Sequence, residues 1–295
     1  MRCLDGKVVA VTGAGMGLGR ALAVEFAKRG ARLALADTDP VALARTGELA
    51  AEAARAGGPG PRLTELDVAD RDAVRGWADD TAARLGGVDL VVNNAGVGVV
   101  APFEETTWED FEWLMGTNFW GVVYGCRAFL PHLRRSREGH LVNVASVFGL
   151  VGVPAMGAYC ASKYAVQGFT EALRHELRLS HANVRVTTVL PGGIGTGFAR
   201  TARKSPSVAG GALAAVSARV ALTSPERGAA VIVRALLRDR RRVRVGPDAV
   251  LIDLGRRILG PGVDPLTRAI SGLLLPITWS RQPQPPESAH RKAAR

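Results

Sequence analysis

Apolar and polar positions follow one repeated order along the chain: a short apolar run, a turn, and a longer segment with helical spacing. Apolar runs predict buried strands at residues 7–12, 31–36, 62–66, 88–92, 140–145, 184–190 and 240–245. Helical segments are predicted at residues 20–29, 40–56, 107–135 and 225–239, after Asp70, and around Tyr159 as far as residue 180. This alternation predicts a single α/β domain of Rossmann type: a doubly wound parallel sheet of about seven strands with helices on both faces.

A glycine-rich turn joins the first predicted strand to the first predicted helix. It reads T-G-A-G-M-G-L-G from Thr12 to Gly19. Glycines allow a tight turn and a close approach of the backbone to a phosphate, and the helix N-terminus offers free N–H groups. The order strand, glycine turn, helix therefore predicts a dinucleotide site. Its expected contacts are Gly13, Gly15, Met16, Gly17, Leu18 and Gly19.

An acidic residue ends the second predicted strand. Asp37 lies about 20 residues beyond the glycines, where a carboxylate can accept hydrogen bonds from ribose hydroxyls and repel a 2′-phosphate. Thr38 follows it and offers no phosphate clamp. This pattern favours NAD over NADP. Arg20 in the glycine turn is the one competitor that would favour NADP, and Asp37 could also be no more than a helix N-cap before Pro40.

Tyr159 and Lys163 are four residues apart, so they share one face of a predicted helix. We expect the Lys163 ammonium to lower the pKa of the Tyr159 phenol towards neutral pH. Ser146 follows the apolar run 140–145, so its hydroxyl should emerge at the carboxyl edge of the sheet, where ligands bind. A hydroxyl beside an activated phenol suits proton transfer at an alcohol or carbonyl. The Tyr-x-x-x-Lys spacing alone would also fit a chance surface pair.

Three further motifs occupy places where a ligand or an internal partner is expected. The run N-N-A-G at 93–96 follows a strand, and its small residues would let a cofactor ring or ribose lie against the backbone. Asn118 stands in the middle of the predicted helix 107–135, where a buried amide needs hydrogen-bond partners. The run P-G-G-I-G-T at 191–196 follows the sixth predicted strand.

The ordered set T-G-A-G-M-G-L-G, N-N-A-G, Asn118, Ser146, Y-C-A-S-K and P-G-G-I-G-T resembles the short-chain dehydrogenase/reductase family in its soluble branch. The resemblance covers roughly residues 5–246. It implies that Tyr159 is the general acid/base, that Lys163 lowers the pKa of Tyr159 and binds the nicotinamide ribose, and that Ser146 orients the substrate oxygen. Asn118 would hold a water that links Lys163 to solvent.

The resemblance also implies the remaining cofactor contacts and the reaction. Besides the glycine turn, these contacts are Asp37, Thr38, Asp67, Val68, Asn94, Ala95, Gly96, Tyr159, Lys163, Pro191, Gly192, Ile194 and Thr196. A second glycine after Pro191-Gly192 departs from the family pattern and loosens that turn. No metal is expected. The prediction is an NAD-dependent oxidoreductase of secondary alcohols or ketones with a Tyr-Lys-Ser-Asn mechanism. The alternatives are an NADPH-dependent carbonyl reductase and a non-catalytic cofactor-binding scaffold or sensor.

Positive charge gathers at the C-terminal end of the chain. Residues 196–295 hold 18 Lys and Arg against 6 Asp and Glu, whereas residues 1–195 hold 20 against 21. No interleaving of aromatic and basic residues accompanies this excess, so nucleic-acid binding is not expected. The three cysteines, Cys3, Cys126 and Cys160, are widely spaced, which together with the absence of a signal peptide predicts reduced thiols in a cytoplasmic protein.

The chain is expected to divide into a catalytic domain, an extension and a tail. Residues 1–250 form the domain, with a mobile lid at 197–222 that leaves room for a bulky, lipophilic alcohol or ketone. Residues 251–280 form an apolar and basic extension, which should pack over the active site or against a second subunit; peripheral contact with a membrane is the alternative. Residues 281–295 should be disordered. By resemblance, the protein is a homodimer or homotetramer that pairs the long helices around Asn118 and Tyr159.

Overall fold

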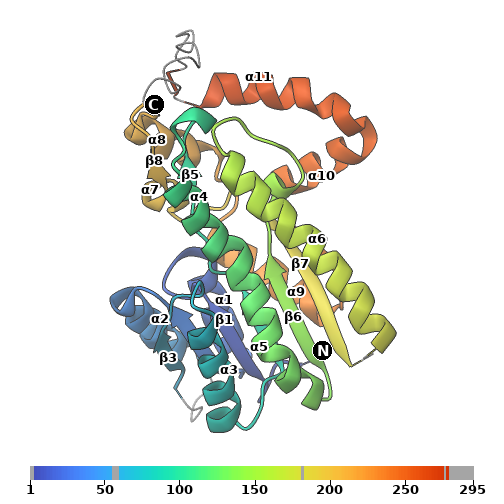
Figure 1. The fold of residues 1–295 in the computed structure, drawn as a ribbon. Coiled ribbons are helices and arrows are strands. Elements are labelled where there is room, and N and C mark those ends of the chain that lie inside the picture. Colours follow the sequence, from blue (N-terminus) through green and yellow to red (C-terminus); the bar gives the residue numbers. More distant parts are fainter. Residues whose placement is uncertain (1–2, 55–59, 181–182, 276, 279–295) are drawn as a thin grey trace, which may run out of the picture.

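Seven parallel strands form the central sheet in the order β3-β2-β1-β4-β6-β7-β9 (Figure 1). The computed structural model describes residues 3–54, 60–180, 183–275 and 277–278. The strands are β1 Val8–Thr12, β2 Arg32–Asp37, β3 Arg62–Glu65, β4 Leu90–Asn93, β6 Gly139–Val144, β7 Val184–Pro191 and β9 Arg242–Val245. Because β1 pairs with both β2 and β4, the strand order reverses there and leaves a crevice at the carboxyl ends. The predicted single-domain, doubly wound sheet is confirmed.

Helices cover both faces of the sheet, which explains why the central strands β1 and β4 are almost entirely apolar (Figure 1). One face carries α1 (Gly17–Ala27), α2 (Pro40–Ala53) and α9 (Pro225–Leu237), and the other carries α3 (Arg71–Leu85), α5 (Gly121–Arg135) and α6 (Gly157–Ser180). Successive residues of β1 alternate between the two cores, with Val9 and Val11 in the first and Val8 and Ala10 in the second.

Capping residues fix where two of these helices begin. The Asp39 side chain accepts the N–H of Ala42 at the start of α2. Asp70 accepts the N–H groups of Asp72 and Ala73 at the start of α3, as the sequence predicts. The interpretation of Asp37 as the N-cap of α2 is wrong, because Asp39 holds that position.

The long helix predicted at 107–135 is continuous but contains one wide turn. It consists of α4 (Trp108–Met115), a π-helical turn η2 (Gly116–Trp120) and α5, and Asn118 lies in the π turn. A π turn of this kind widens the helix locally and often marks a functional site. The short 3-10 helices are η1 Phe103–Glu105, η3 Val147–Gly149 and η4 Gly260–Val263.

The region after β7 folds back over the carboxyl edge of the sheet. It contains α7 (Phe198–Thr201), β8 (Arg203–Lys204), α8 (Gly210–Val220), α10 (Pro247–Leu259) and α11 (Asp264–Leu274). The strand β8 pairs in parallel with β5 (Val99–Val100) to form a second, two-stranded sheet that the sequence did not predict. Figure 1 shows α10 and α11 as an arm that crosses above α6 towards α8.

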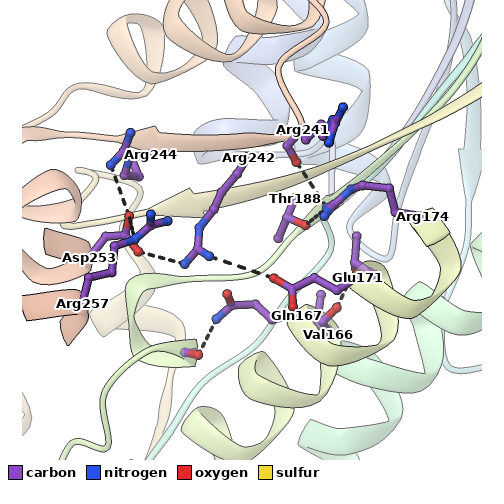
Figure 2. Close-up of polar contacts among 12 residues, drawn as sticks. Val166, Gln167, Glu171, Arg174, Thr188, Arg241, Arg242, Arg244, Asp253 and Arg257 are labelled. Carbon is purple, nitrogen blue, oxygen red and sulfur yellow. Dashed lines mark hydrogen bonds and ion pairs between the residues drawn. The ribbon is translucent and has the colours of Figure 1, made fainter. Parts of the chain in front are cut away.

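A buried carboxylate attaches α10 to the edge of the sheet (Figure 2). The side chain of Asp253 is 2% exposed and binds Arg242 at 2.9 Å and Arg244 and Arg257 at 3.2 Å each. Arg242 and Arg244 come from β9, whereas Arg257 comes from α10 itself. A second contact, at 4.0 Å, joins Arg242 to Glu171 on α6. The arm is therefore anchored at its base by charge pairs.

Two predictions concern the chain ends and membranes. The tail predicted to be disordered, residues 281–295, lies outside the described residues. None of the helices within the described part of the chain is long and apolar enough to cross a bilayer.

Candidate active site

The predicted motifs meet at the carboxyl edge of the sheet, around the crevice between β1 and β4. The glycine turn follows β1, Asp37 ends β2, Asn93 ends β4, Ser146 follows β6 and Pro191 ends β7. Since parallel strands bring their carboxyl ends to one edge, residues far apart in the sequence become neighbours here.

Thr12 and Asn94 bind the glycine turn to the loop after β4. The Thr12 hydroxyl accepts the N–H groups of Asn94 at 3.0 Å and Ala95 at 3.1 Å. The Asn94 amide donates to the carbonyl oxygens of Thr12 and Gly13 at 3.0 and 3.1 Å. A Cβ atom on Gly13, whose φ is +62°, would lie 2.7 Å from the Cα of Ala95. Glycine is required at this position both by the backbone angle and by the close approach of the second loop.

The N-terminus of α1 fits an anionic group. Met16 is the N-cap and provides no side-chain hydrogen bond, and the first turn of α1 contains no acidic residue. Its N–H groups and partial positive charge are therefore available to a pyrophosphate. Gly17 has a φ of +54°, and a Cβ there would lie 2.8 Å from the Cβ of Thr196. The 191–196 loop thus closes against the glycine turn, as the predicted cofactor site requires.

Asp37 and Arg20 both face the glycine turn, but in different ways. Asp37 Oδ2 accepts the N–H of Gly15 at 2.7 Å, and its Oδ1 accepts the N–H of Asp39 at 3.0 Å. The Arg20 guanidinium donates to the Thr46 hydroxyl at 3.0 Å and to the carbonyl oxygen of Gly15. Arg20 therefore stabilises the turn from within, whereas Thr38 beside Asp37 is exposed.

Tyr159 is half-buried and lies beside Ser146. The hydroxyl of Ser146 accepts the N–H of Phe148 at 3.1 Å, which leaves its own hydrogen available to the Tyr159 oxygen or to a substrate oxygen. Burial raises the pKa of Tyr159 to about 12, and the hydrogen bond with Ser146 opposes that rise. The expectation that Lys163 lowers this pKa is not met, because removal of the phenol from water dominates.

Lys163 shares the face of α6 with Tyr159, as the four-residue spacing predicts. Its Nζ lies 5.7 Å from the centre of the Tyr159 ring and donates to the carbonyl oxygen of Val144 at 3.1 Å. Burial lowers the pKa of Lys163 to about 8, so the side chain is still mostly cationic at pH 7. A side chain on Gly96 would approach Lys163 Nζ at 3.4 Å and Asn118 Oδ1 at 3.3 Å, so these three residues surround one small space.

The Asn118 side chain uses nearly all of its hydrogen-bonding capacity within the protein. Its Oδ1 accepts the N–H of Val97 at 2.8 Å, and its Nδ2 donates to the carbonyl oxygen of Val97 at 3.0 Å and to the Ser162 hydroxyl at 3.2 Å. Ser162 in turn donates to the carbonyl oxygen of Tyr159 at 2.8 Å. Both amide hydrogens are used, which leaves one Oδ1 lone pair for any further contact.

The remaining predicted cofactor residues lie around the same edge. Ile194 pairs with Thr223, and the N–H of Gly192 donates to Val245 at 2.9 Å. Asp67 accepts the N–H of Ala69 at 2.9 Å, and Val68 is buried against Gly121 of the long helix. The outer end of the crevice is therefore bordered by β3 and the inner end by the loop after β7.

A family model for the short chain dehydrogenases matches residues 7–207, which contain all of the predicted catalytic residues and most of the chain. The chain belongs to the short-chain dehydrogenase family. It is accordingly an oxidoreductase.

Relatives agree with this assignment over nearly the whole chain. The oxidoreductase SadH of Mycobacterium tuberculosis is 43% identical over 274 residues, which cover 91% of this chain and 96% of SadH. A short chain dehydrogenase/reductase from Burkholderia phymatum, solved in complex with NAD, is 33% identical with a TM-score of 0.79, over 87% of this chain and 95% of that one. A 3-ketodihydrosphingosine reductase of Bacteroides thetaiotaomicron is 39% identical over 137 residues, 46% of this chain and 50% of that one.

Apolar side chains surround the Tyr159 ring in this short-chain dehydrogenase. Phe198 packs at 5.2 Å and Phe148 at 6.3 Å from the ring centre, both edge-on. They belong to a cluster, here called the tyrosine cluster, whose other members are Val100, Val153, Ala155, Met156, Cys160, Ala199, Ala202, Val208, Leu213, Leu275 and Ile277. Leu275 and Ile277 follow α11, so the C-terminal extension contributes to the tyrosine cluster.

Arg203 links β8 to α4 of the long helix. Its guanidinium binds Asp110 at 2.7 Å and stacks 3.7 Å above the Trp113 ring. Its N–H donates to the carbonyl oxygen of Gly98 at 2.9 Å, next to the β5–β8 pair. The predicted lid, 197–222, lies against the rest of the domain in this structure.

Three residues of the site were not predicted from the sequence. Ser162 supports Asn118, Phe198 covers Tyr159, and Asp248 binds the 191–196 loop through Gly193. Ser162 had a detectable signal, because it is a polar residue on the same helical face as Tyr159, three positions later. Phe198 and Asp248 had none, because their contacts depend on how distant segments fold together.

Proposed function

We propose that this chain transfers a hydride between NAD(H) and a secondary alcohol or ketone, with Tyr159 as the general acid/base. One observation carries the proposal: the Tyr159 hydroxyl is hydrogen-bonded with Ser146, and Lys163 Nζ lies 5.7 Å from the centre of the Tyr159 ring, at the sheet edge that also holds the glycine turn. A phenol, a hydroxyl donor and a cation at one point suit proton exchange with a carbonyl or carbinol oxygen.

The side chains handle the proton and the developing charge. In ketone reduction Tyr159 gives its proton to the carbonyl oxygen, while the free hydrogen of the Ser146 hydroxyl holds that oxygen in place. In alcohol oxidation the phenolate takes the proton back. Lys163, cationic near pH 7, shares the helix face of Tyr159 and would bind the nicotinamide ribose. A nicotinamide dinucleotide bound at the glycine turn supplies or accepts the hydride.

The dinucleotide is NAD(H) in this proposal because of Asp37. Its carboxylate lies against Gly15 at the end of β2, where it would meet the ribose hydroxyls and repel a 2′-phosphate. Arg20, the one competitor, is directed to the Gly15 carbonyl and to Thr46. The NAD-bound relative supports the same choice. An NADPH-dependent reductase remains the alternative cofactor assignment.

A lipophilic substrate is proposed because the residues of the tyrosine cluster, which pack beside the Tyr159 ring, are apolar. Phe148, Phe198 and Met156 would face the substrate carbon chain near the reacting oxygen. Burial of apolar surface contributes about 25 cal/mol per Å², so long hydrocarbon groups gain the most from such walls. The similarity to a reductase of a sphingoid ketone supports this substrate class.

Substitution of Tyr159 by Phe tests the proposed reaction. The change removes the hydroxyl and keeps the ring that packs on Phe198, so NADH affinity should stay within about threefold while kcat falls by a factor of about 10² to 10⁴. Steady-state turnover with a panel of secondary alcohols and ketones, alongside NADH fluorescence titration, measures both. Unchanged turnover in Tyr159→Phe would contradict the role of Tyr159 as general acid/base. It would favour the alternative of a non-catalytic scaffold or sensor.

We also propose a homodimer or homotetramer paired through the long helices. Trp120 on the π turn is 47% exposed and stacks on Tyr124, and Tyr164 on α6 is 42% exposed. Aromatic residues on adjacent helices are typical of interface cores. Sedimentation analysis at micromolar concentration should give a dimer or tetramer, and Trp120→Glu should give the monomer. A wild-type monomer would end this proposal.

Peripheral contact with a lipid surface is proposed for the outer face of α10 and α11. Large apolar residues are exposed there, namely Leu251, Leu254, Ile258, Leu266, Ile270 and Leu273. The chain leads from this face directly to Leu275 and Ile277 in the tyrosine cluster, which would bring a lipid-dissolved substrate close to the site. Co-sedimentation with anionic vesicles at low salt should capture the full chain, whereas Leu251→Asp with Ile258→Asp should not bind. The absence of wild-type binding to the vesicles would contradict this proposal.

A cytoplasmic location is also proposed. The three described cysteines form no disulfide, which is consistent with that location.

A further inference from the structure

A carboxylate at the base of the α10–α11 arm holds the loop that follows β7. Asp248 lies in the first turn of α10, two residues beyond Gly246, which separates β9 from this helix. Its Oδ2 accepts the N–H of Gly193 at 2.5 Å. Gly193 belongs to the P-G-G-I-G-T run, so a residue outside every predicted motif binds one of the predicted cofactor loops.

The two glycines of this loop leave room for the carboxylate and for the next segment. A Cβ on Gly192 would overlap the Asp248 carboxylate, and a Cβ on Gly193 would overlap the carbonyl oxygen of Val220. The departure from the family pattern at Gly193 therefore has a structural reason. The second glycine does not loosen the turn, because Asp248 supplies a hydrogen bond that fixes it.

The placement of Asp248 is not explained by stability alone. Its Oδ1 is buried and has no hydrogen-bond partner among the described residues. An unpaired buried carboxylate oxygen opposes folding, so the residue is expected to be retained for another reason. The helix that carries it cannot easily turn away, because Asp253 anchors α10 to Arg242 and Arg244 of β9 (Figure 2).

We propose that Asp248 is a positioning residue that holds the 191–196 loop in the shape that receives the nicotinamide end of the cofactor. The inference rests on the proposed function, and the resemblance to the family puts Thr196 of this loop at the nicotinamide carboxamide. Further contacts fix the rest of the loop: Gly192 binds Val245, and Gly195 binds Thr223 at 3.1 Å. Gly193 is the member of the loop that depends on α10, so α10 is coupled to cofactor binding through one hydrogen bond.

Two ligands separate a local effect at the nicotinamide end from general damage. NADH contacts both ends of the site, whereas ADP-ribose is the same molecule without nicotinamide. In the full-length Asp248→Ala variant, the dissociation constant for NADH should rise about tenfold and that for ADP-ribose should stay within twofold. Asp248→Asn keeps an oxygen that can accept the Gly193 N–H, so its NADH affinity should stay within threefold of wild type. Titration calorimetry measures all of these constants.

Asp264→Ala is the matched control, since Asp264 also lies in the first turn of a helix of the α10–α11 arm but is exposed. It should change neither constant. Equal loss of both ligands in Asp248→Ala, or wild-type NADH affinity in that variant, would overturn the inference. If Asp248→Ala does not fold, Asp248→Ser carries the same comparison. Failure of the wild-type chain to bind NADH more tightly than ADP-ribose would instead count against the proposed function.

Discussion

The cofactor-binding part of the chain, up to residue 196, and the region that follows it are held together by different physical means. In the first part, glycines and short polar side chains bring backbone segments into close contact, as Thr12, Asn94 and Gly13 do. In the second, charged pairs attach helices to the domain, as Asp253 and its arginines do. The first part has a net charge near zero, and the second carries the basic excess.

This difference determines how each region tolerates change. Contacts between backbone atoms leave no space for a new side chain, so function and fold share the same positions in the first part. The arm of α10 and α11 touches the domain through a few side chains and exposes much of its apolar surface. We therefore expect large effects from small changes around the glycine turn and local effects from changes in the arm, except at Asp248 and Asp253.

The largest contrast should come from adding one methyl group in each region. A Cβ on Gly19 would overlap the Gly13 carbonyl oxygen, whereas a Cβ on Gly255 in α10 would meet no atom within 4 Å. Gly19→Ala should lower the free energy of unfolding by about 3 kcal/mol. Gly255→Ala should raise it by about 0.5–1 kcal/mol, because alanine favours a helix over glycine. Urea unfolding compares the two variants. Equal effects would contradict the proposed difference between the regions.

Removal of the buried charge in the arm should have an intermediate effect. Asp253→Asn leaves Arg242, Arg244 and Arg257 without their carboxylate, which costs about 2 kcal/mol. The estimate is below that for a fully buried pair because the arginine side chains are 28–58% exposed. Thermal unfolding measures the loss. Asp264→Asn, an exposed neighbour, should change stability by less than about 0.5 kcal/mol. If Asp253→Asn lowers stability no more than Asp264→Asn does, the ion pairs of Asp253 do not anchor the arm.

The fold and most of the candidate site could be predicted from the sequence because their signals are local. The glycine turn, the Tyr159–Lys163 spacing and the strand before Ser146 each occupy a few consecutive residues. Asn118 was identified as a polar residue in a buried helix, although its π turn and its partner Ser162 were not.

The interpretation of the tyrosine pKa failed for a physical reason. The sequence shows that Lys163 is near Tyr159, but it does not show that Phe148 and Phe198 exclude water from the phenol. Desolvation is the largest effect on the phenol and raises the pKa of Tyr159 to about 12. The contact of Asp248 with Gly193 could likewise not be predicted from the sequence, because 55 residues separate the two.

Fluorescence titration of the wild-type chain and of Asp37→Ala with NADH and with NADPH tests most directly the central claim, that this chain binds NAD(H) through Asp37. Its expected effect is smaller than those of Gly19→Ala and Asp253→Asn. The wild type should bind NADH at least tenfold more tightly, about 1.4 kcal/mol, because the Asp37 carboxylate accepts ribose hydroxyls and repels a 2′-phosphate. Asp37→Ala should lose most of that preference through tighter NADPH binding. Tighter binding of NADPH by the wild type, or an unchanged preference in the variant, would contradict the assignment of Asp37 and of NAD(H).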